Sequence, residues 1–158
     1  MKFAHAMGAQ VTVLSQTFEK REDALRVGAD QYHAINDPTT FQRLGSGSDL
    51  ISNTVSAKAD LNASLSLLDL DGTLVSLGAP PDDLSVSLFT LFANRRSFAG
   101  SLIGGVRETQ EMLDFCAAHR IAPQVEIIAA DQINDAWDRM LASDVRYRFV
   151  IDVSTLAG

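Results

Sequence analysis

The stretch VTVLSQTFEKREDALRVGADQYHAI, residues 11–35, decides the fold class. It opens with a β-branched run, Val11 to Ser15, which is typical of a buried strand. A helix is predicted over Lys20 to Val27, with Thr17 as its candidate N-cap. A second strand, Gln31 to Ile35, follows directly. A strand, a helix and a strand in so short a length form the repeat that builds a parallel sheet.

The rest of the chain continues this alternation. Further strands are predicted over Asp49–Val55, Thr73–Leu77, Ser97–Ile103, Val125–Ile128 and Phe149–Val153. Helices are predicted from Asp60 to about Asp71, over residues 86–94, over Glu108–His119, and from an Asp131 cap to Leu141. The pattern favours an α/β fold with a largely parallel sheet.

Composition narrows the function classes. The chain has 158 residues, 46% of them hydrophobic, and a net charge of −7, so it is long enough for one globular domain. That charge argues against a nucleic-acid partner, which requires a basic face. The single cysteine, Cys116, cannot form an internal disulfide and favours a cytoplasmic location. No apolar run approaches the roughly 20 residues of a membrane span.

Ligands of parallel sheets bind at the carboxyl ends of the strands. Four segments follow or end predicted strands here, and each contains Gly, Ser or Thr, which allow a ligand to approach the backbone. They are residues 15–20, 53–56, 78–80 and 100–105.

Several stretches, taken in order, resemble the zinc-dependent medium-chain alcohol dehydrogenases of the cinnamyl alcohol dehydrogenase type. They are Lys2–Ala9, Lys20–Leu25 with Gly28–Asp30, Asp71–Leu74, Ala99–Gly105 running into Arg107–Met112, Asp131–Asn134 and Asp144–Phe149. The resemblance implies a Rossmann-like, three-layer, doubly wound parallel sheet. It also implies an incomplete NADP-binding domain over residues 1–130 and a segment over 131–158 that returns to a catalytic domain.

The resemblance also shows what these residues lack. The family's zinc-bearing catalytic domain, its first nucleotide-domain strand and its Gly-rich phosphate turn have no counterpart here, so the sheet is expected to be truncated. Zinc sites need three or four close ligands, whereas this chain has one cysteine and three scattered histidines, His5, His33 and His119. We therefore expect no metal ligand and no catalytic residue in this chain.

The turn after the first predicted strand carries the cofactor hypothesis. NAD-binding versions of the fold place an acid there, and its charge would repel a 2′-phosphate. Ser15, Gln16, Thr17 and Lys20 instead offer hydrogen-bond donors. In the family this pattern accompanies a preference for NADP, although Gln16 and Glu19 depart from the commoner residues. The alternative is an ordinary helix N-terminus with a solvated lysine.

Three further segments match family positions near the nicotinamide. Thr54 matches a residue beside the nicotinamide riboside, although Asn53 stands where Asp is usual. Gly78 matches a glycine whose backbone approaches that ribose, and the alternative is a plain strand-end turn. Ser101, Leu102 and Ile103 match the segment that contacts the carboxamide. The alternative is an edge or interface strand, and the two interpretations can both hold.

Arg146 matches a cationic position that reaches the pyrophosphate in related dehydrogenases, with Arg148 as a rival. A planar guanidinium can pair two phosphate oxygens at once. The alternative is a surface ion pair.

Two functions from different classes remain open. In the family, zinc polarises a primary alcohol or aldehyde oxygen and a hydride moves to or from the nicotinamide. This chain would supply the cofactor-binding portion of that oxidoreductase and would be inactive alone. The other possibility is a non-catalytic module that dimerises or binds nucleotide weakly.

Two structural expectations follow from the resemblance. The strand over residues 97–104 should be a sheet edge that pairs with a second copy in a homodimer. The strands at Val11–Ser15 and Asp49–Val55 should flank the place of the missing first strand. Direct pairing of those two strands is slightly favoured over filling by a second chain, since unpaired buried backbone groups are costly.

Overall fold

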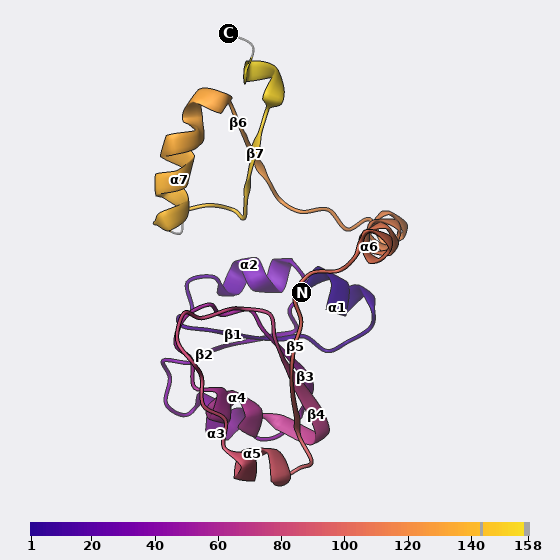
Figure 1. Ribbon diagram of the computed structural model, residues 1–158, viewed down its shortest axis with the longest axis vertical. Coiled ribbons are helices and arrows are strands. Elements are labelled where there is room, and N and C mark those ends of the chain that lie inside the picture. Colours follow the sequence, from indigo (N-terminus) through magenta and orange to yellow (C-terminus); the bar gives the residue numbers. More distant parts are fainter. Residues whose placement is uncertain (143, 157–158) are drawn as a thin grey trace. The chain divides into compact units, whose positions relative to one another are not determined.

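The computed structural model describes residues 1–142 and 144–156 and shows an α/β protein (Figure 1). All strand pairings in these described residues are parallel, as expected. The chain divides into two compact units, Met1–Glu111 and Met112–Gly158.

The first unit begins with a two-stranded sheet. Its elements are α1 (Lys2–Ala6), β1 (Thr12–Ser15), α2 (Arg21–Arg26), β2 (Gln31–Ala34) and α3 (Thr40–Leu44). Strand β1 pairs with β2, and Val13 lies opposite Tyr32. A small core forms where Val13 and Tyr32 pack with Ala24 and Leu25 of α2 and with Ala29.

A three-stranded sheet completes the first unit. Its elements are β3 (Ser48–Asn53), α4 (Leu61–Ser66), β4 (Leu68–Ser76), α5 (Leu88–Phe92) and β5 (Ser97–Gly100), with the strands in the order β3-β4-β5. Asp60, where the predicted helix begins, caps α4 because its carboxylate accepts from the backbone N–H groups of Asn62 and Ala63. The main core lies between this helix and the sheet and contains Leu61, Leu65, Leu68 and Leu74.

The boundary between α4 and β4 differs from the sequence prediction. The helix ends at Ser66, and Leu68, which lies within the predicted helix range, is the buried first residue of β4. A run such as Leu67-Leu68 fits either a helix or a strand, and only packing decides between them. The strand is irregular between its pairings with Ser48 and Leu50. Asp71 adopts a left-handed conformation there, with φ of 61°.

Other differences are smaller. Helix α3 was not predicted, because a single turn carries no amphipathic period. Thr17 does not cap α2: Lys20 is the N-cap residue, and no side chain makes a cap hydrogen bond. Strand β5 ends at Gly100, earlier than the predicted Ile103.

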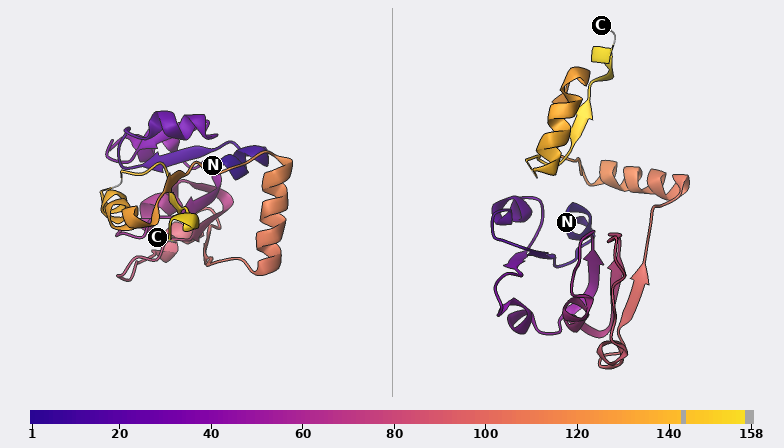
Figure 2. Two further views of the ribbon diagram at one scale, coloured as in Figure 1. Left: turned by 90° about the horizontal axis from the view of Figure 1, so that it is seen from above. Right: turned by 60° about the vertical axis from the view of Figure 1, so that its left-hand side comes forward.

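The expected direct pairing of the strands that flank the missing position is wrong. Among the described residues, β1 hydrogen-bonds to β2 and β3 to β4, and the two sheets are not joined to each other. Figure 2 shows β1 and β2 apart from the three strands of the second sheet within the first unit. Each sheet has its own core cluster, so each is stabilised by its own packing.

Helix α6 (Val106–Ala118) leads into the second unit. The elements after it are β6 (Glu126–Ile128), η1 (Ala130–Gln132), α7 (Ile133–Leu141), β7 (Phe149–Ile151) and η2 (Val153–Leu156). Asp131, the expected cap, lies within η1, and Gln132 is the N-cap residue of α7. The Arg139 guanidinium bonds to Asp144 and Glu126, which raises the pKa of Arg139. Among the described residues, no helix is both long and apolar enough to cross a membrane.

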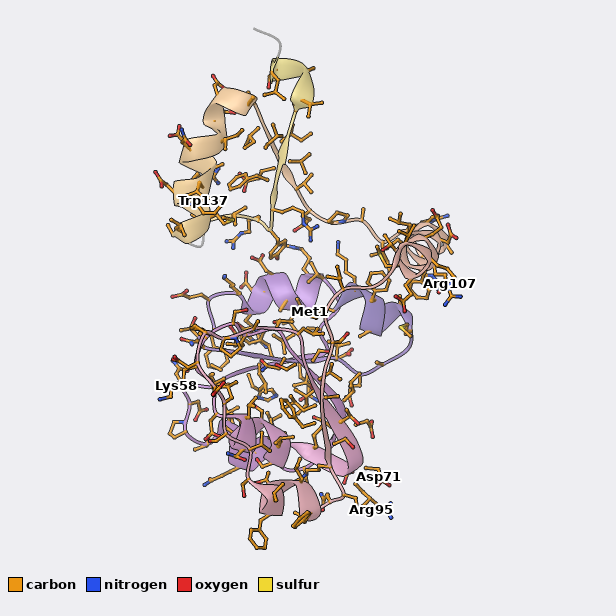
Figure 3. All side chains as sticks on the ribbon, viewed as in Figure 1. Met1, Lys58, Asp71, Arg95, Arg107 and Trp137 are labelled. Atoms are coloured by element: carbon orange, nitrogen blue, oxygen red, sulfur yellow. The ribbon has the colours of Figure 1, made fainter. Side chains whose placement is uncertain are left out.

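Arg96 connects the elements around the main core. Its Nε donates to the carbonyl of Leu68 at 2.9 Å, and its two terminal nitrogens donate to the carbonyls of Thr90 at 3.1 Å and Ser66 at 3.2 Å. These carbonyls belong to the end of α4, the start of β4 and helix α5. The neighbouring Arg95 instead pairs with Asp71 at the surface, as Figure 3 shows.

We expect Arg96→Lys to destabilise the first unit by about 1–3 kcal/mol, because a single ammonium cannot serve three carbonyls and leaves part-buried acceptors unpaired. Urea unfolding measures the change. Arg95→Lys is the matched control and should have a smaller effect, because an exposed ion pair contributes little. Equal losses in both variants would contradict the role assigned to Arg96.

Candidate nucleotide site

The proposed phosphate turn lies between β1 and α2. Ser15 ends the strand and Arg21 begins the helix, so residues 16–20 form the turn at the carboxyl end of β1. Gln16, Thr17 and Lys20 are exposed, and Ser15 is half-buried. The turn therefore presents hydroxyl, amide and ammonium donors to solvent, and Glu19 is its single acid.

Tyr32 on β2 holds this turn and was not singled out from the sequence. Its hydroxyl donates to the Thr17 carbonyl at 2.7 Å, and its ring lies 6.2 Å from that of Phe18. Tyr32 itself is buried in the small core. The contact ties the turn to the neighbouring strand. Fifteen positions separate the partners along the chain, so no local pattern could have indicated it.

The other candidate segments lie at the carboxyl ends of β3, β4 and β5. Asn53, Ser76 and Gly100 are aligned across the three strands. Thr54 and Ser101 follow directly, and a pocket of about 520 Å³ opens beside the second and third strands. It is lined by Ser76, Leu77, Gly78, Ala79, Gly100, Ser101 and Leu102.

The structure therefore brings Gly78, Ser101 and Leu102 together in one pocket. Thr54 and Ile103 are not among its lining residues. Ile103 is 95% exposed and Leu102 is 91% exposed. Ser101 and Leu102 come from one segment and Gly78 from another, so the pocket lies across the ends of two strands.

Gly78 has a structural reason to be glycine. A Cβ atom there would lie 2.2 Å from the Val55 carbonyl oxygen and 2.9 Å from the carbonyl carbon of Thr54. The Gly78 N–H also donates to the Asn53 carbonyl at 3.1 Å. The backbones after β3 and β4 therefore touch at this point, and both the strand-end turn and a nucleotide contact remain compatible with it.

Asn53 organises the same junction. Its carbonyl also accepts from Leu77 at 2.8 Å, and its side-chain oxygen accepts from the Val55 N–H at 3.1 Å. An Asx-type turn of this kind fixes the direction in which the chain leaves the strand. Asparagine supplies the same acceptor as the aspartate that is usual in the resembling family.

Arg146 belongs to the second unit. It lies in the segment before β7, where its backbone N–H donates to Glu126 Oε1 at 3.2 Å. The Arg148 carbonyl accepts from the Glu126 backbone N–H. The role of Arg146 at a pyrophosphate stays a prediction, as does the division of the chain at residues 130 and 131.

The histidines and the cysteine make local contacts. His5 packs beside Gly28, His33 bonds to Gln31, and His119 stacks on Phe115. Cys116 contacts the Met112 sulfur at 3.8 Å. Within residues 1–142 and 144–156, no three His, Cys, Asp or Glu side chains are grouped to hold a metal ion. The described residues therefore do not fit the zinc sites that the resemblance implies for the family.

A family model of zinc-binding dehydrogenases matches residues 1–118. The chain belongs to that family, and the resemblance noted from its sequence is confirmed. It is 59% identical over 156 residues to an NADP-dependent alcohol dehydrogenase of Mycolicibacterium smegmatis, covering 99% of this chain and 45% of the relative. It is 47% identical to an aldehyde reductase of Escherichia coli, again covering 99% of this chain and 45% of the relative.

Solved structures agree with the sequence comparison. A cinnamyl alcohol dehydrogenase from Sorghum bicolor superposes with a TM-score of 0.92 at 38% identity, covering 97% of this chain and 44% of the other. A Helicobacter pylori protein of the same type, solved with NADP(H), superposes with a TM-score of 0.82 at 34% identity, covering 97% of this chain and 44% of the other. The chain thus spans less than half the length of these relatives, and the Rossmann-type fold is confirmed.

We expect Gly78→Ala to destabilise the first unit by about 1–3 kcal/mol, because its methyl group would displace the backbone after β3. Gly100→Ala is the matched control at the end of the next strand, where the nearest atom to an added Cβ is 4.0 Å away. Thermal unfolding of both variants checks this. Similar melting temperatures would show that the contact between the Gly78 and Val55 backbones does not constrain the site.

Proposed function

We propose that residues 1–158 are the cofactor-binding portion of an NADP-dependent alcohol dehydrogenase that interconverts primary alcohols and aldehydes. The exposed donor turn Ser15–Lys20 is the observation that carries the proposal. A dianionic 2′-phosphate accepts charge-assisted hydrogen bonds from such groups. The printed names of the Mycolicibacterium relative and the Helicobacter structure, both of which mention NADP, support this cofactor.

In this proposal the chain binds and orients the nucleotide and does not supply the chemical groups. The Ser15, Gln16, Thr17 and Lys20 turn holds the 2′-phosphate. Gly78, Ser101 and Leu102 line the pocket that receives the nicotinamide end, with Thr54 and Ile103 assigned to the same end of the nucleotide. The catalytic zinc and its ligands belong to parts of the family's polypeptide that residues 1–158 do not contain. Hydride transfer is therefore assigned to the whole dehydrogenase.

Calorimetric titration with NADP and NAD tests the cofactor assignment. We expect NADP to bind more tightly than NAD. Lys20→Ala should weaken the affinity for NADP about tenfold, equivalent to about 1.4 kcal/mol, and should leave the affinity for NAD unchanged. Arg107→Ala removes the same charge from an exposed position on α6 and serves as the control. Tighter binding of NAD, or unchanged NADP affinity in Lys20→Ala, would contradict the proposal.

The same family suggests a homodimer through the segment 97–104, and the structure offers a supporting observation. Strand β5 ends the order β3-β4-β5, and all four of its residues are exposed. The Ser101 N–H donates to Ser76 on β4. Because backbone groups alternate along a strand, the N–H groups of Phe98, Gly100 and Leu102 point away from β4, where a second copy could pair.

Leu102→Pro should therefore convert a dimer to a monomer without unfolding the chain, because it removes an outward donor and none of the bonds to β4. Leu102→Ala keeps the N–H and should stay dimeric. Sedimentation velocity of the two variants checks the expectation. A wild-type chain that remains monomeric at high concentration would exclude this interface.

A further inference from the structure

The backbone ladder between β1 and β2 stops inside the candidate phosphate turn. The Ile35 N–H donates to the Ser15 carbonyl at 2.8 Å, and the Asn36 N–H donates to the Gln16 carbonyl at a longer 3.4 Å. Among the described residues, no backbone N–H bonds to the next carbonyl, that of Thr17. A side chain takes over at this point, because the Tyr32 hydroxyl donates to that carbonyl at 2.7 Å.

Tyr32 also contacts the residue on the other side of the same peptide group. Its ring centroid lies 6.2 Å from that of Phe18, and the two planes are tilted by 40°, within the range of attractive aromatic pairs. Tyr32 is only 7% exposed and packs in the small core of its sheet. One buried side chain of the neighbouring strand therefore holds the Thr17–Phe18 peptide at both ends.

This contact decides which way the N–H of that peptide points. The C=O and N–H groups of a planar trans peptide point in opposite directions. Because the Thr17 carbonyl points toward the Tyr32 hydroxyl, the Phe18 N–H points away from it. Among the described residues this N–H has no hydrogen-bond partner, and both Thr17 and Phe18 are exposed. The turn therefore offers a directed backbone donor in addition to its side-chain donors.

We propose that Tyr32 is a positioning residue for a ribose 2′-phosphate. Its hydroxyl fixes the Thr17–Phe18 peptide so that the Phe18 N–H and the side chains of Ser15, Thr17 and Lys20 can bond to one phosphate group. A dianionic phosphate gains from each added donor, and an uncharged 2′-hydroxyl gains much less. Tyr32 thereby increases the discrimination between 2′-phosphorylated and unphosphorylated nucleotides without touching either. The inference rests on the proposed NADP site at the Ser15–Lys20 turn.

The physical basis is pre-organisation. A turn that samples several backbone orientations must be ordered when its ligand binds, and that ordering reduces the affinity. The Tyr32 hydroxyl and ring supply the order beforehand, from a side chain anchored in the core. The Lys20 ammonium lies at the end of a flexible stem, so it contributes charge without a fixed direction.

Tyr32→Phe is the test variant, because it removes the hydroxyl and keeps the ring in the core. The probes are adenosine 2′,5′-bisphosphate and 5′-AMP, which differ only by the 2′-phosphate and carry no nicotinamide. We expect the variant to weaken binding of the bisphosphate about fivefold, as the loss of one hydrogen bond does, and to leave binding of 5′-AMP unchanged. Calorimetric titration measures both affinities, and their ratio is the readout.

Thr40→Val is the matched control within the same part of the fold. The Thr40 hydroxyl also donates to a carbonyl, that of Ala34 on β2, at 2.7 Å, and it is fully buried. Its removal leaves a buried acceptor unpaired, so it should lower the melting temperature at least as much as Tyr32→Phe does. The ratio of the two affinities should nevertheless stay at the wild-type value.

Lys20→Ala separates failure of this inference from failure of the proposed function. Equal binding of both probes by the wild-type chain, or an unchanged ratio in Lys20→Ala, would refute the phosphate turn and the role of Tyr32 with it. A ratio that falls in Lys20→Ala and is unchanged in Tyr32→Phe would overturn the role of Tyr32 alone. Equal weakening of both probes by Tyr32→Phe, or a similar fall of the ratio in Thr40→Val, would also overturn it, since either would make the contact merely structural.

Discussion

The aligned parallel pairing of β3, β4 and β5 is the constraint on which the candidate nicotinamide site depends. Leu74, fully buried beneath α4, lies between Ile51 and Phe98 in this ladder. Two residues further on, Asn53, Ser76 and Gly100 are side by side, so the three chains leave the sheet together. A slip of one residue would send Leu74 to the opposite face of the sheet, and the pocket beside Ser76 and Gly100 would no longer form.

Contacts between backbones then decide the shape of that site. The Asn53 carbonyl accepts two N–H groups from the end of β4, and the Gly78 backbone lies against Val55. A residue that matches a nucleotide-contacting glycine in the family is thus also required by the protein's own packing. The two roles are compatible, because a glycine that lets one backbone approach on one side leaves its other side equally open.

The two sheets of the first unit depend on separate cores. A two-stranded sheet is marginal without further strands or a packed helix, and β1–β2 depends on the small core beneath α2. Among the described residues, neither β1 nor β3 has a strand paired to its second edge.

The sequence by itself determined the class of fold, the family and the donor chemistry of the Ser15–Lys20 turn. These depend on local periodicity and on residue identity, which are present in the order of the amino acids. The predicted elements were wrong only locally, where the sequence signal was short or ambiguous. Helix α3 is one turn long, and Leu67-Leu68 suits a helix end as well as a strand start.

Only the tertiary structure decided which distant groups meet. The Tyr32 hydroxyl reaches the Thr17 carbonyl, the Arg96 guanidinium joins three carbonyls, and the Gly78 backbone meets that of Val55. It also decided that β1 and β3 do not pair. The physical reason is that hydrogen bonding and close packing depend on which segments become neighbours in space, and no local pattern of residues records that adjacency.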